Sequence, residues 1–97
     1  FIDWQNWGAK KIKRFIDAVG YPCDNAKSYL DDKIMHFLDV KVLDDVEIED
    51  RERHLGKVIF IKDGYPVIVC KKGLIGLVDI RDENNKSLMI NFRSRFK

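Results

Sequence analysis

The chain has 97 residues, of which 45% are apolar and 35% are charged, and its formal net charge is +2. This composition predicts one globular domain with one core and excludes a disordered or membrane-spanning chain, because no apolar run approaches the roughly 18 residues that cross a bilayer. The small net charge does not by itself indicate nucleic-acid binding.

The chain begins at Phe1 with neither an initiator methionine nor a signal peptide, so we expect a fragment of a longer chain. Ile2, Trp4 and Trp7 precede the first predicted helix. We expect them to pack against this helix or against a neighbour that the fragment lacks. In the second case both tryptophans are expected to be partly exposed.

The first predicted element is an amphipathic helix over residues 8–19. Its apolar positions recur at the spacing of one helix face, at Ile12, Phe15, Ile16 and Val19. The other face carries Lys10, Lys11, Lys13, Arg14 and Asp17. Asn6 is the predicted N-cap, and Gly20 with Pro22 beyond it is the predicted stop.

Two strands are predicted next, over residues 26–30 and 33–43, joined by a tight turn at Asp31 and Asp32. In the second strand we expect alternate positions to share the apolar face, with His36 on the same parity: Ile34, Leu38, Val40 and Val42. Residues 44–53 are dense in acidic side chains and predict an exposed loop.

A meander of three strands follows, over residues 56–62, 65–70 and 74–81. Asp63-Gly64 is a strong hairpin signal, and the chain turns again at residues 71–73. Pro66 cannot donate a backbone hydrogen bond, so we expect it at a strand start or an edge. A polar turn at residues 82–86, a last strand at 87–92 and a basic tail complete a mainly β fold, a small antiparallel barrel or sheet with one packed helix.

No arrangement of residues indicates catalysis or metal binding. Cys23, Cys70, His36 and His54 lie far apart and form no ligand motif. We interpret both cysteines as reduced thiols, Cys70 as a buried strand residue, His36 as a half-buried strand residue and His54 as a loop residue. The glycines form no phosphate loop, and the acidic stretch lacks the pattern of a calcium loop.

Nucleic-acid contact is the binding hypothesis with most support from the residues. Cations gather on the helix and in the tail, which gives a set of candidate tRNA or partner contacts: Lys10, Lys11, Lys13, Arg14, Arg93 and Arg95. Tyr21, Tyr29 and Tyr65 offer rings on which bases could stack. The alternative is a helix whose outer face is simply solvated.

The order of several short motifs is more specific. Ile2-Asp3-Trp4 leads into a helix with Arg14, Ile16 and Ala18, and then comes Tyr21-Pro22. Later strands begin at Gly56-Lys57-Val58-Ile59 and Gly73-Leu74-Ile75. In this succession the chain resembles the C-terminal domain of the formyltransferase family, which includes methionyl-tRNA formyltransferase and sugar-nucleotide N-formyltransferases. Asp17 replaces the family's second Arg, and Cys23 replaces the Gly after Tyr-Pro, with Asp24-Asn25 inserted.

The resemblance implies an open OB-like antiparallel β-barrel with one N-terminal helix. It implies that chemistry lies in a larger N-terminal domain that binds 10-formyltetrahydrofolate and formylates an amine, either methionyl-tRNA or an amino sugar nucleotide. The present domain is then a cytoplasmic accessory domain with no catalytic, cofactor-binding or metal-binding residue. Its partners are its own catalytic domain, a second subunit or tRNA. The alternative is an independent OB-like RNA- or tRNA-binding module.

Overall fold

The computed structural model describes residues 1–19, 25–84, 86 and 94–97. The predicted strand at 87–92 and the predicted helix stop at Gly20 lie outside these residues, as do Tyr21, Pro22, Cys23 and Arg93. The elements are one helix, five strands and a short 3₁₀ turn: α1 (Ala9–Ala18), β1 (Ala26–Leu30), β2 (Lys33–Leu43), η1 (Arg51–Arg53), β3 (Val58–Lys62), β4 (Tyr65–Val69) and β5 (Leu74–Arg81).

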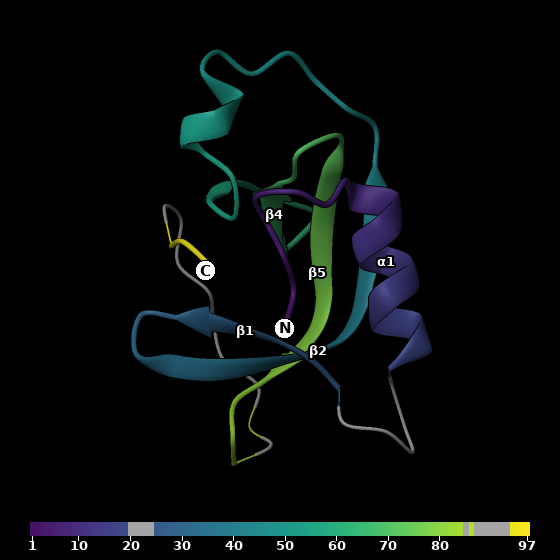
Figure 1. Cartoon of the computed structure of the whole chain (residues 1–97), viewed down its shortest axis with the longest axis vertical. Coiled ribbons are helices and arrows are strands. Elements are labelled where there is room, and N and C mark those ends of the chain that lie inside the picture. The colour runs from purple at the N-terminus through teal and green to yellow at the C-terminus, as the bar shows by residue number, and fades with distance from the viewer. Residues whose placement is uncertain (20–24, 85, 87–93) are drawn as a thin grey trace.

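The strands form one antiparallel sheet in the order β1-β2-β5-β4-β3, and α1 packs against β2 (Figure 1). The sheet is not closed, so the predicted mainly β, open barrel-like fold with one helix is confirmed. Pro66 is the second residue of β4 and lies opposite Ile61 of β3. It is therefore at a strand start, as expected. In the described part of the chain no helix is long and apolar enough to cross a membrane.

Helix α1 begins differently from the prediction. Its N-cap is Gly8, without a side-chain cap, and the amide of Ala9 donates to the carbonyl oxygen of Lys72 at 2.7 Å. Asn6 is not the cap, because its backbone and side-chain N–H groups both donate to the carboxylate of Asp3. The Asp3 side chain therefore stabilises a separate turn over residues 3–6, before the helix. At the start of the helix, the Lys72 carbonyl of the β4–β5 turn accepts the hydrogen bond from Ala9.

The apolar face of β2 also differs from the prediction. Met35 and Phe37 are buried, whereas Leu38 is 37% exposed and Val42 is exposed as well. The register between β2 and β5 shifts on both sides of Asp39. Phe37 and Val40, three residues apart, therefore both face the core, which simple alternation does not allow.

The barrel interior is built around three aromatic rings. Trp4 is buried, and its ring centroid lies 5.9 Å from that of Phe37 and 6.0 Å from that of Phe96. The expectation that Trp4 is partly exposed was wrong, because the N-terminal segment folds into this barrel. Trp7 is half-buried and packs edge-on against Phe15 of α1, with the centroids 5.0 Å apart, as expected for packing on the helix.

Residues 94–97 join the two edges of the sheet. On one side the backbone of Lys97 exchanges two hydrogen bonds with Tyr29 of β1, at 2.9 and 3.0 Å. On the other side Ser94 accepts from the amide of Val58, and Phe96 donates to Gly56 at 2.7 Å. Gly56 has a φ of +81°, and a Cβ there would collide with the carbonyl of Phe96. This tail therefore completes the wall of the barrel.

A buried polar chain fixes the same junction. The indole Nε1 of Trp4 donates to Ser28 Oγ at 2.8 Å, and the Ser28 hydroxyl donates to the Lys97 carbonyl at 3.0 Å. Ser28 is fully buried, so each of these groups needs a protein partner. The first residues, β1 and the tail are thus held by one hydrogen-bonded path.

Of the predicted exposed loop 44–53, residues 44–50 are mostly exposed, whereas residues 51–53 form the 3₁₀ turn η1. One cation of η1 fastens the loop to the sheet. The Arg51 guanidinium donates to the carbonyls of Cys70 and Gly73 at 2.8 and 3.2 Å, to the carbonyl of Val46 at 2.9 Å, and to the carboxylate of Asp45. Beneath this loop lies a small second apolar cluster, against which the loop side chain of Ile48 packs: Leu55, Val67, Val69 and Leu74.

Candidate partner-binding surface

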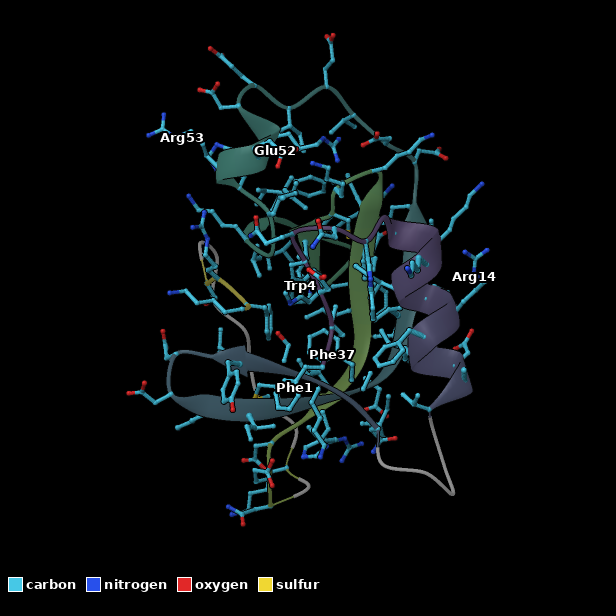
Figure 2. The ribbon with its side chains drawn as sticks, in the orientation of Figure 1. Phe1, Trp4, Arg14, Phe37, Glu52 and Arg53 are labelled. Carbon is cyan, nitrogen blue, oxygen red and sulfur yellow. The ribbon has the colours of Figure 1, made fainter. Side chains whose placement is uncertain are left out.

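The cations of α1 differ in how much charge they leave available. Lys13 is paired, with its Nζ 3.2 Å from Asp17 and 3.4 Å from Asp39. The hydrogen bond to Asp17 is the largest cause that raises the pKa of Lys13 above its usual value. Lys11 lies over the Trp7 ring, 5.0 Å from its centroid. Arg14 projects outward from the exposed face of the helix (Figure 2).

The tail does not extend this positive surface. Arg95 donates to the backbone carbonyl of Arg53 in η1, and Arg93 lies outside the described residues. In Figure 1 α1 and the tail lie on opposite sides of the molecule with β5 between them. The described end of the tail, which carries Arg95, therefore does not form one patch with the predicted contact residues of the helix.

An open cleft of about 380 Å³ lies at the N-terminal end of α1. The β4–β5 turn brings Lys72 to this cleft beside Lys10 and Lys11. The sequence predicted the turn at residues 71–73 but not that Lys72 lies beside the helix cations. The end of β2 and the following loop bring Asp44 and Asp45 to the same cleft. The cleft therefore combines three lysines with two carboxylates instead of forming a uniformly basic groove.

Asp45 stays ionised in this setting. Its partial burial acts to raise its pKa, but the hydrogen bond and the positive charge of Arg51 outweigh burial, and the pKa is lowered from 3.8. Because Arg51 is also bonded to the sheet, the charge of Asp45 is held in a fixed position beside the lysines. This fixed negative charge opposes the binding of a phosphate in the cleft.

The two described tyrosines that could stack on bases lie on different strands, and each packs against another side chain. Tyr65 lies beneath Lys41, whose Nζ is 4.9 Å from the ring centroid. Tyr29, on β1, stacks on Phe1 with the centroids 5.1 Å apart and the planes at 20°. Tyr21 lies outside the described residues. Phe1 was not among the residues that the sequence pattern singled out.

The two histidines and Cys70 lie in surroundings typical of structural residues, not of a catalytic or metal site. His36 is half-buried on β2, as predicted, with its Nε2 3.0 Å from Glu83. His54 ends η1, and its buried Nδ1 has no hydrogen-bond partner. Burial raises the pKa of the free Cys70 thiol to about 12, so this thiol is a core side chain and not a nucleophile. Among the described residues no group of three His, Cys, Asp or Glu side chains is placed to hold a metal ion.

Comparison with protein families identifies the family of this chain. The model of the formyl transferase C-terminal domain matches residues 1–95, a range that holds α1, all five strands and the start of the closing tail. The resemblance inferred from the motif order is thereby confirmed. Among curated proteins, no match to this chain was found.

Proposed function

Because this chain belongs to the formyl transferase C-terminal domain family, we propose that it is the non-catalytic accessory domain of a cytoplasmic enzyme that transfers a formyl group to an amine. The formyl donor is 10-formyltetrahydrofolate, and the acceptor is methionyl-tRNA or an amino sugar nucleotide. The family match over residues 1–95 carries this proposal, since it pairs the domain with an N-terminal catalytic domain.

The cleft beside α1 does not fit the folate donor. A pterin ring is held in an enclosed, mainly apolar site with a few placed polar groups. The cleft beside α1 is open, and its lining of lysine, aspartate and small aliphatic side chains includes no aromatic ring. Binding of the donor is therefore assigned to the catalytic domain, and no step of the reaction is placed on this chain.

Within the enzyme the domain acts by packing and positioning. Three observations favour this role over tRNA contact: Lys13 is neutralised by Asp17 and Asp39, the cleft contains Asp44 and Asp45, and the described end of the tail lies opposite the helix. A protein that tracks a phosphate backbone needs many cations on one continuous surface. In the described part of this chain the positive side chains are spread over separate surfaces, and nearby carboxylates offset part of their charge.

The test compares the full-length enzyme with a form that lacks residues 1–97. Both candidate acceptors, methionyl-tRNA and an amino sugar nucleotide, are assayed. We expect removal to lower the rate of formyl transfer to the natural acceptor by roughly 10–100-fold, because misplacement of reactants lowers the reaction rate strongly. As a matched control, replacing Lys10, Lys11 and Arg14 together by alanine is expected to keep the activity within about twofold, as exposed substitutions seldom affect folding.

The alternative, an RNA- or tRNA-binding module, predicts a different pattern. The triple alanine variant would then lose tRNA binding at low salt in a filter-binding assay, and the dependence of binding on salt would become shallower by about one unit for each lost phosphate contact. That result, with unchanged activity in the form lacking residues 1–97, would replace the accessory role by the binding module.

A further inference from the structure

An open apolar groove of about 350 Å³ lies between the loop 44–50 and β3. Two of the large apolar side chains that the chain leaves exposed line it, Val46 at 48% and Phe60 at 37%. Ile48 of the loop and Ile59 of β3 line it as well, and both are half-buried against the second apolar cluster. Grouped apolar side chains in contact with water form the kind of surface that proteins use for association.

One anion and one cation border the same groove. Glu47 belongs to the loop, whereas Lys57 immediately precedes β3, so the two charges come from different walls. Within the part of the chain that the structure describes, neither side chain has an ion-pair partner. Both charges are therefore available to a binding partner.

Both walls of the groove are held in place. The Arg51 guanidinium fastens the loop to the sheet through the carbonyls of Cys70 and Gly73. At the other wall, the amide of Val58 donates to the Ser94 carbonyl at 2.8 Å, which fixes the start of β3. A surface that is ordered before association loses little conformational entropy when it binds.

We propose that this groove is the contact surface of a two-fold symmetric dimer, in which it faces the same groove of a second copy of the chain. A two-fold interface uses one patch on both copies, so the patch must complement itself. A two-fold axis through the groove brings Glu47 of each copy to Lys57 of the other and sets the apolar side chains face to face. A partner of one charge sign would satisfy only one of these two residues.

The experiment is sedimentation velocity of the full-length protein that carries this domain. Six groove side chains are fewer than the roughly 20–30 residues a side of a standard interface, so we expect a weak dimer with a Kd on the order of 10 μM. Glu47→Lys and Lys57→Glu each place like charges together twice, and each is expected to weaken self-association by at least about tenfold. An equimolar mixture of the two variants restores both opposite-charge pairs and is expected to dimerise within about threefold of the wild type.

Phe60→Ala tests the apolar part of the groove and is expected to weaken the dimer by about tenfold. Lys33→Glu and Leu38→Ala are the matched controls, because both residues are exposed on β2 and lie outside the groove. Each control is expected to stay within about twofold of the wild type.

Four results would overturn the proposal. They are a wild type that stays monomeric up to about 20 times the expected Kd, charge variants that associate as well as the wild type, a mixture of the charge variants that stays monomeric, and controls that weaken the dimer equally. A mixture that dimerises also shows that both charge variants are folded. The inference goes beyond the proposed function, and sedimentation reports mass and not formyl transfer, so its failure is seen separately from failure of the accessory role.

Discussion

Arg51 offers the sharpest test of how this small domain is held together. Its side chain is only 18% exposed and donates to three backbone carbonyls and to Asp45. Arg51→Met keeps most of the aliphatic stem and removes every donor. The carbonyl of Cys70 then loses its charged partner in a buried position, whereas the carbonyl of Gly73 still accepts from the Cys70 amide at 3.2 Å.

A hydrogen bond to a charged group contributes about 1.5–3 kcal/mol when it is buried, and an exposed one contributes less. The buried Cys70 carbonyl loses this partner, the buried Gly73 carbonyl keeps one hydrogen bond, and Val46 is exposed, so we predict that Arg51→Met lowers the free energy of unfolding by about 2–4 kcal/mol. Arg51→Lys keeps the charge but loses the planar fork, and is expected to recover less than half of this difference.

Urea denaturation followed by tryptophan fluorescence measures the effect, and Arg53→Met is the control. Arg53 is largely exposed, and its side chain lies 3.9 Å from Asp50, an ion pair expected to contribute at most about 0.5 kcal/mol. A value for Arg51→Met within about 0.5 kcal/mol of the wild type would refute the view that this guanidinium fastens the loop to the sheet.

Three further predictions concern pH, register and reactivity. Because the folded-state pKa of Asp45 lies below 3.8, its ionised form stabilises the fold above that pH and loses this effect as pH falls through the folded pKa. The stability difference between wild type and Asp45→Asn should therefore shrink below about pH 4 in urea titrations, and a difference that grows there would contradict the pairing with Arg51. Phe37→Ala is expected to cost about 3–5 kcal/mol and Leu38→Ala less than about 1 kcal/mol, and comparable costs would argue against the shifted register. In a Cys23→Ser variant, the Cys70 thiol, with a pKa near 12, should react with a thiol reagent at pH 8 only as fast as the domain opens, and rapid labelling of this variant would place Cys70 outside the core.

Much of this fold could be predicted because local signals and tertiary structure agree. The Asp63-Gly64 turn has positive φ at both residues, and Gly73 has a φ of +84°, so the turn residues mark the hairpins of the meander where they occur. The buried residues of α1 include Ile12 and Ile16 of the predicted apolar face. Such features depend on neighbours within a few positions, which a single sequence displays directly.

The features that escaped prediction depend on distant residues. The exposure of Leu38 follows from how β2 meets β5, which no pattern within β2 reveals. The burial of Trp4 depends on Phe96, and Arg51 finds its acceptors in the turn after β4. The candidate surface was only partly foreseen for the same reason. The helix cations were visible, but the pairing of Lys13 with Asp39 and the ring that stacks on Tyr29 required the fold.

The junction of the first and last described residues also sets the order of events during synthesis. Trp4, Ser28 and Phe37 are made early, yet the ring and the carbonyl that complete their surroundings belong to Phe96 and Lys97. At a translation rate of ~5–20 residues per second, roughly 5–20 s pass between the synthesis of Trp4 and that of Phe96. During that interval the rings of Trp4 and Phe37 lack the Phe96 ring that packs on them, and the barrel can be completed only after residues 94–97 have left the exit tunnel.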